Sequence, residues 1–235
     1  MAEFRYAQFC ALARAAEIVG ERWTLLIVRD LTLGPLRFSD LRRRLKGVSP
    51  SVLSERLTQL ERRGLIERRV LGPPAASTVY ELSEMGRALQ PAMIELTKWG
   101  ARFLLPPQPG EHLEPAWAIV ALEAFARHLP TPSCSIELRI PDGAETHVVQ
   151  VQGGEHGTRV RREPGDLEAD TDLQVTLEPM ELLALLAGLR SPSEALASGC
   201  IQATGDLTLL EELPQLFEID VGGTGSSPRA GNPLT

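Results

Sequence analysis

The sequence is poor in the side chains that build metal sites, disulfide frameworks and many catalytic centres. It has only 3 cysteines and 4 histidines among 235 residues, and aromatic side chains make up 5% of the chain. Three scattered cysteines are too few for a disulfide framework or a four-thiolate zinc site. No histidine has zinc-type spacing to cysteine or carboxylate partners, and no phosphate-cradling glycine loop is found. We therefore expect neither an enzyme nor a metal or cofactor site.

Long apolar runs are also missing. No stretch approaches the roughly 18 apolar residues that a membrane-spanning helix needs. The N-terminus, Met1 to Arg5, lacks the layout of a signal peptide. These features predict a cytoplasmic protein without a membrane partner. A hydrophobic content of 43% is sufficient for a packed core.

Charge is divided unevenly between the two halves of the chain. Residues 1–105 contain 17 Lys and Arg against 11 Asp and Glu, whereas residues 106–235 contain 7 against 20. The resulting balances of +6 and −13 give the overall net charge of −7. Such a split indicates two modules with different partners, of which only the basic one suits phosphates.

Proline and glycine mark the boundary between the modules. Leu105 is followed by three prolines and a glycine up to Gly110, and proline cannot continue a helix. The sequence predicts a domain over 1–105, a linker over 106–115, a domain over 116–220, and a disordered tail rich in Gly, Ser and Pro over 221–235.

Hydrophobic periodicity predicts a helical first half with one hairpin and a mixed second half, which together make an α+β protein. In the first half the expected helices are 11–19, 23–33, 38–45, 50–63 and 83–104, the last one bent or broken at Pro91, and the expected strands are 65–71 and 77–82. In the second half the expected helices are 117–128, 179–189, 193–198 and 207–217, and the expected strands are 135–140, 147–151, 158–162, 173–177 and 201–204.

The helix expected over 50–63 has the layout of a DNA-recognition helix. Ser49 is a suitable N-cap, and Pro50 suits the first helical position. Leu53, Leu57 and Leu60 form one apolar stripe. The opposite face carries short hydrogen-bonding groups in its first turns, which is where such a helix reads base edges in the major groove.

The segment around this helix is strongly basic. Residues 37–69 hold ten Lys and Arg against four Asp and Glu. The candidate DNA contacts are Arg37, Ser39, Arg42, Arg43, Lys46, Ser49, Ser51, Ser54, Glu55, Arg56, Thr58, Arg62 and Arg69, with Arg68 as a further phosphate contact. The turn 72–76 is the candidate wing. An exposed face of Ser, Thr and Arg is often merely solvated, so the pattern alone leaves both interpretations open.

Residues 34–70, GPLRFSDLRRRLKGVSPSVLSERLTQLERRGLIERRV, resemble the HxlR family of winged helix-turn-helix regulators, which are relatives of the MarR group. Residues 17–27, 79–86 and 99–100 are similar to further signatures of that family, in the same order along the chain. The resemblance implies a transcriptional repressor whose first and last helices form a homodimer. It also implies that the two recognition helices of the dimer enter successive major grooves of a near-palindromic double-stranded operator. It further implies that Trp23 and Phe38 are core residues.

Cys10 is a candidate redox sensor. The family often opens with Cys-Pro-Val, and in some members that cysteine senses oxidants or electrophiles, whereas this sequence has Cys10-Ala11-Leu12. A reactive thiol needs exposure and nearby positive charge, which Arg14 can supply one helical turn away. The alternative, which we favour, is that Cys10 is an unreactive small side chain buried where the first helices of the dimer meet.

The acidic half is similar to sterol-carrier-protein-like domains across residues 113–219. That resemblance implies a layered α+β fold with a hydrophobic groove, and it implies either an apolar small-molecule effector or a contact with a protein. Leu182, Leu183, Leu185, Leu186 and Leu189 cover more than one helix face, so they line either a cavity or an ordinary core. A carrier of hydrophobic ligands is therefore an alternative to a regulator.

Overall fold

The protein, described from a computed structural model, forms two compact units. They comprise Met1–Ile94 and Glu95–Thr235. Residues 5–72, 77–162 and 171–222 are described. The domain and linker boundaries expected from the sequence stay predictions. Within the described residues, no helix is long and apolar enough to cross a membrane.

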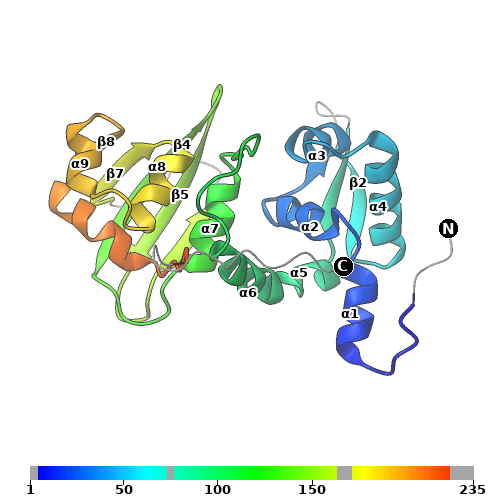
Figure 1. Ribbon diagram of the computed structural model, residues 1–235. Helices are drawn as coiled ribbons and strands as arrows, with labels where there is room; N and C mark the ends of the chain where they lie inside the picture. The colour runs from blue at the N-terminus through cyan, green and yellow to red at the C-terminus, as the bar shows by residue number, and fades with distance from the viewer. Residues whose placement is uncertain (1–4, 73–76, 163–170, 223–235) are drawn as a thin grey trace. The chain divides into compact units, whose positions relative to one another are not determined.

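The first unit combines helices with a small antiparallel sheet (Figure 1). Its helices are α1 (Ala11–Val19), α2 (Thr24–Thr32), α3 (Phe38–Arg44), α4 (Pro50–Arg62) and α5 (Glu84–Arg87). Its strands are β1 (Leu36–Arg37), β2 (Ile66–Val70) and β3 (Thr78–Leu82), in the order β1-β3-β2. Each of the first four helices and both long strands were expected within two residues of these bounds. The two-residue β1 was missed, because two residues show no periodicity.

One apolar core holds the first unit together. Ile27, Val28 and Leu31 of α2 pack with the α4 leucines and with Ile66 of β2. Trp23 and Phe38 pack against this core from its edge, which confirms that they are structural side chains. The architecture is a winged helix-turn-helix.

The long helix expected over 83–104 is in fact two helices. After α5 the chain leaves the helix at Ala88 and Leu89, and α6 runs over Gln90–Ala101. Pro91 therefore occupies the first turn of α6, where a missing backbone N–H leaves no hydrogen bond unmade. The division between the two units falls inside α6.

The second unit is a five-stranded mixed sheet with helices. Its helices are α7 (Trp117–Phe125), α8 (Pro179–Leu186) and α9 (Pro192–Ala197). Its strands are β4 (Cys134–Asp142), β5 (Glu145–Gly153), β6 (Arg159–Arg162), β7 (Leu173–Leu177) and β8 (Ile201–Gly205), in the order β6-β5-β4-β7-β8. Among the strand pairs of the described residues in this unit, β4–β7 alone is parallel. The predicted α+β class is confirmed for the chain.

The sheet of the second unit has one apolar and one polar face. Ile136, Leu138 and Ile140 alternate along β4 and are fully buried on the face that α7 and α8 cover (Figure 1). The residues between them face the other way, so Glu137 lies beside Gln150 of β5 and Gln174 of β7.

The prediction of one helix over 207–217 is wrong. The chain forms two short 3-10 helices instead, η1 (Leu207–Glu211) and η2 (Leu213–Leu216). Pro214 has no backbone N–H to continue a helix through this segment, and its ring disfavours the helical conformation of the residue before it. The leucine spacing gave no sign of this break.

Gly86 in α5 lies so close to the backbone of Leu65 that a side chain at this position would clash with it. A Cβ at this position would lie 2.0 Å from the carbonyl oxygen of Leu65, whereas a Cβ on helical Gly100 would meet nothing within 4 Å. We expect Gly86→Ala to lower the free energy of unfolding by about 1–3 kcal/mol through overpacking. The matched control, Gly100→Ala, should raise it by about 0.5–1 kcal/mol. Urea unfolding followed by circular dichroism measures both, and equal effects would contradict the predicted backbone contact.

Candidate nucleic-acid interface

Helix α4 is fixed at its N-terminus and along one face. The Ser49 Oγ accepts a hydrogen bond from the Val52 N–H at 3.3 Å, and Pro50 occupies the first turn. Leu53, Leu57 and Leu60 are buried. The predicted cap and the predicted leucine stripe are both present, so the opposite face of α4 must point outward.

That outward face carries the polar residues expected to read bases. Ser51, Ser54 and Thr58 are exposed, and so is Arg62 near the C-terminal end. The Thr58 Oγ1 donates to the Ser54 carbonyl at 2.9 Å, but this hydroxyl keeps its own acceptor lone pairs. Glu55 is partly buried and accepts a hydrogen bond from Gln59 at 3.2 Å. The serines are thus the more accessible of these side chains.

Exposed basic and polar side chains lie before α4 in the chain. Arg37, Ser39, Arg42, Arg43 and Lys46 are all exposed on α3 or at its ends. Arg37 N-caps α3, where its backbone N–H donates to the Asp40 carboxylate at 3.3 Å. A second helix that reads the groove and a first helix that crosses the backbone are typical of helix-turn-helix docking. The exposure of these side chains is compatible with the expected phosphate contacts, which stay predictions.

Some of the arginines expected to contact phosphate already have carboxylate partners, namely Arg56, Arg68 and Arg69. Arg56 is only 11% exposed, and its Nη1 lies 3.1 Å from Glu21 Oε2. Arg68 pairs more loosely with Glu61, at 3.6 Å. The roles of these arginines in DNA binding stay predictions, and Arg56 faces the protein rather than solvent.

Arg69 forms a bidentate pair with Glu81 across the β2–β3 ladder. The two hydrogen bonds are 2.8 and 3.1 Å long, and the carboxylate raises the pKa of Arg69. The turn that these strands lead to was expected as the wing. Of that turn Gly72 is described and exposed, while 73–76 lie outside the described residues.

Sequence reasoning missed Arg63, the C-cap of α4. Its guanidinium donates to the carbonyl oxygens of Glu17 and Ile18, 46 and 45 residues away. A contact over that separation leaves no local pattern in the sequence. The charge excess around α4 gave no means of separating Arg63 from its neighbours.

The three cysteines differ in environment. Cys134 is buried, which raises the pKa of its thiol, whereas Cys10 and Cys200 are exposed. Cys10 is the N-cap residue of α1 in the single chain, so its expected burial at a dimer contact stays a prediction. Arg14, expected to activate this thiol, instead pairs with Glu17 at 3.1 Å.

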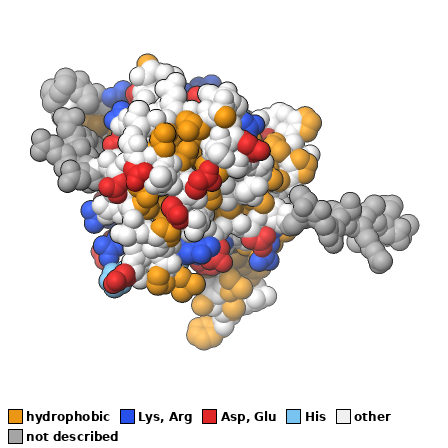
Figure 2. Space-filling view, turned by 90° about the vertical axis from the view of Figure 1, so that its left-hand side faces the viewer, with side chains coloured by type: hydrophobic (Ala, Val, Ile, Leu, Met, Phe, Trp, Pro, Cys, Tyr) orange, Lys and Arg blue, Asp and Glu red, His pale blue; other side chains and the backbone are white. Residues whose placement is uncertain are grey.

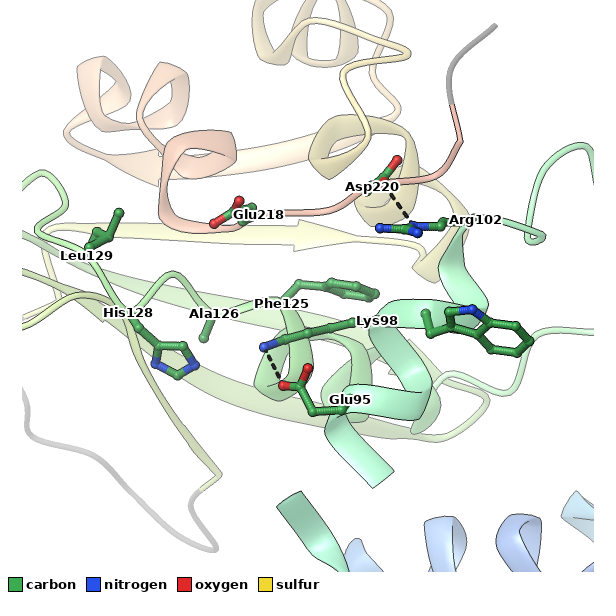
Figure 3. A pocket seen from close by; sticks show the side chains of 10 residues that line it. Glu95, Lys98, Arg102, Phe125, Ala126, His128, Leu129, Glu218 and Asp220 are labelled. Carbon is green, nitrogen blue, oxygen red and sulfur yellow. Dashed lines mark hydrogen bonds and ion pairs between the residues drawn. The ribbon is translucent and has the colours of Figure 1, made fainter. Parts of the chain in front are cut away.

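The second unit contains a pocket of about 440 Å³ with a charged rim (Figure 3). Two ion pairs lie along it, Lys98 with Glu95 at 3.0 Å and Arg102 with Asp220 at 3.0 Å. Phe125 of α7 also lines it. The pocket therefore differs from the hydrophobic groove expected between sheet and helices.

The leucines expected to line that groove are mostly core residues. Leu182, Leu185 and Leu186 are buried, whereas Leu183 is partly buried and Leu189 is exposed. The surface of this unit shows acidic side chains scattered among apolar ones (Figure 2). The apolar effector stays a prediction.

The fold and the exposed face of α4 define a winged helix-turn-helix protein. Residues 18–108 match the HxlR-like helix-turn-helix family. The chain is 38% identical over 93 residues to the uncharacterized HTH-type transcriptional regulator YvaP of Bacillus subtilis, which covers 40% of this chain and 86% of that protein. The chain belongs to the HxlR-like helix-turn-helix family.

Other relatives match over a similar length. The HTH-type transcriptional regulator YodB of Bacillus subtilis is 36% identical over 92 residues, which is 39% of this chain and 82% of that protein. A structure of the reduced form of YodB superposes with a TM-score of 0.37 at 33% identity, and it covers 43% of this chain and all of that one. These matches account for less than half of the chain.

Residues 128–219 match a different family, described as the alkyl sulfatase C-terminal family. This match does not confirm the expected sterol-carrier-protein-like identity, which stays a prediction. What is observed for the segment is a region of α+β structure rich in sheet.

The cap of α4 can be tested directly. We expect Ser49→Ala to lower the free energy of unfolding by about 1 kcal/mol, because the Val52 N–H loses its side-chain acceptor. Ser54→Ala, whose side chain is exposed in the second turn of the same helix, should change it by less than about 0.5 kcal/mol. Thermal or urea unfolding of both variants provides the measurement, and equal losses would remove the capping role.

Proposed function

We propose that this chain is a repressor that acts as a homodimer and inserts the two α4 helices into successive major grooves of a near-palindromic operator. That it is a DNA-binding transcriptional regulator, as the sequence predicted, follows from its family and from relatives named HTH-type transcriptional regulators. The observation that carries the proposal is the exposed row Ser51, Ser54 and Thr58 on a helix that buried leucines hold in place. A regulator of chromosomal DNA also acts where that DNA lies, in the cytoplasm.

Exposed apolar side chains at the start of α1 support the homodimer. Phe9, which precedes the N-cap of α1, is fully exposed, and Leu12 in the first turn of α1 is 76% exposed. Such side chains are stabilised when a second copy covers them. A two-fold dimer brings the same patch of both copies together, and a pseudo-palindromic operator matches that symmetry.

We propose that neither unit has a catalytic role. For the second unit we propose a sterol-carrier-protein-like fold. The mixed five-stranded sheet with α7 and α8 on its apolar face supports that fold. The match to the alkyl sulfatase C-terminal family concerns residues 128–219 alone. The net negative charge of this half disfavours DNA. We propose that it instead biases the dimer geometry of the first unit when an apolar ligand binds.

Two kinds of substitution separate base reading from phosphate contact. Replacing Ser51 and Ser54 together by Ala should lower the preference for operator over random duplex about tenfold, with little change in binding to random DNA. Arg43→Ala should weaken binding to all duplexes alike and reduce the salt dependence by about one unit of slope. Fluorescence anisotropy with operator and scrambled duplexes at several salt concentrations measures both effects. If neither variant changes binding, α4 is not the recognition helix.

A thiol-sensing repressor is the second candidate, and the exposure of Cys10 favours it. In this case an oxidant such as hydrogen peroxide converts the Cys10 thiolate to a sulfenic acid and lowers operator affinity. Cys10→Ser should then abolish the loss of binding after peroxide treatment, whereas Cys200→Ser should not. Equal peroxide responses of the wild type and Cys10→Ser would exclude Cys10 as the sensor.

A further inference from the structure

The C-terminal end of α1 is attached to the recognition helix by an arginine. Arg63 Nη1 donates to the Glu17 carbonyl at 2.8 Å and to the Ile18 carbonyl at 3.2 Å. Both carbonyls lie in the last turn of α1, where the helix leaves acceptors unpaired and its dipole favours a cation. The same guanidinium belongs to the residue that caps α4, so one side chain joins the ends of the two helices.

A second arginine of α4 makes a parallel connection. Arg56 pairs with Glu21 at 3.1 Å, and Glu21 follows directly after Gly20, the C-cap of α1. Arg56 Nη1 also donates to Gln59 Oε1 at 2.7 Å within α4, which holds the guanidinium in one orientation. Its side chain is 11% exposed and that of Glu21 is 42% exposed, so the pair is screened from water mainly on the arginine side.

Apolar packing also holds the C-terminal end of α1 against the core of the first unit. Ile18 packs on the core that contains the α4 leucines. Leu12 in the first turn of α1 and Phe9, which precedes its N-cap, are exposed at the other end. The helix is nine residues long, or about 13 Å. It is therefore a short rigid element, anchored to α4 at one end and free to meet a partner at the other.

We propose that Arg56 and Arg63 are positioning residues that fix the direction of α4 relative to the dimer face on α1. They thereby set the distance between the two half-sites that the dimer accepts. This inference rests on the proposed function, because the distance has meaning only for a dimer that binds two half-sites. It assigns these arginines a role in operator geometry rather than in phosphate binding, for which their inward contacts make them poorly placed.

The experiment measures binding as a function of half-site spacing. Selection from random duplexes with the wild-type protein identifies the half-site. Duplexes then carry two such half-sites at centre-to-centre spacings varied in single base pairs around about 10.5 bp, one helical turn. Fluorescence anisotropy gives an affinity for each duplex and for a single half-site. The variants are Arg63→Met, which keeps the aliphatic stem, and Glu21→Gln, which removes only the charge that holds Arg56.

We expect the wild type to favour one spacing and both variants to lose that preference. The affinity ratio between the best spacing and one 2 bp away should fall about tenfold, while affinity for a single half-site should change less than about twofold. The control Arg43→Met removes an exposed cation from α3 and should weaken binding at every spacing alike. Combining Glu21→Arg with Arg56→Glu should restore the wild-type profile, which loss of structure alone would not allow.

The outcomes distinguish this inference from the proposed function. A wild-type protein with no preference for any duplex would overturn both. A wild-type protein with a preferred spacing, together with folded variants that keep the same profile, would overturn the positioning role only. If circular dichroism shows that Arg63→Met is unfolded, the spacing profiles of Glu21→Gln and of the charge-swapped pair still test the positioning role.

Discussion

Leu53, Leu57 and Leu60 hold α4 against the core of the first unit, and each is at most 2% exposed. Burying a leucine side chain contributes about 1.5–3 kcal/mol, so the stripe fixes which way the helix faces. With 3.6 residues per turn, the face opposite the leucines, which carries Ser51, Ser54 and Thr58, then points to solvent. Ser51 and Ser54 owe their accessibility to this anchoring, and the cap at Ser49 determines where the helix, and with it the reading face, begins.

The basic residues around α4 divide into two groups that share a side-chain type but not a role. Arg42, Arg43 and Lys46 are exposed, and their charge is available to phosphates. Arg56 and Arg63 turn inward and bind a carboxylate and two backbone carbonyls. A planar guanidinium with several fixed donors suits such contacts better than an ammonium group does. The basic residues around α4 thus comprise exposed cations and cations with partners inside the protein.

On the polar face of its sheet, the second unit buries the carboxylate of Glu137 among hydrogen-bonding partners. Glu137 is 7% exposed and accepts hydrogen bonds from Gln174 at 2.7 Å and Gln150 at 3.2 Å. Arg139 donates to the same carboxylate at 2.6 Å. Buried charge is tolerated when it is paired and hydrogen-bonded in this way. The apolar residues on the other face are left to pack against α7 and α8, so the acidic half folds on its own core.

The sequence by itself determined the helix-turn-helix, the Ser49 cap, the leucine stripe and the two-stranded ribbon, because each depends on residues within a few turns of one another. It also determined the charge division between the halves, which is simple counting. Only the tertiary structure decided that Arg56 and Arg63 face inward and that Cys10 is exposed in the single chain. The first of these depends on contacts between segments up to 46 residues apart, and the second on what surrounds α1. The break in the helix expected over 207–217 has a local cause in Pro214, which the leucine spacing outweighed in the prediction. Periodicity reports which residues share a face, but it does not report which distant group that face meets.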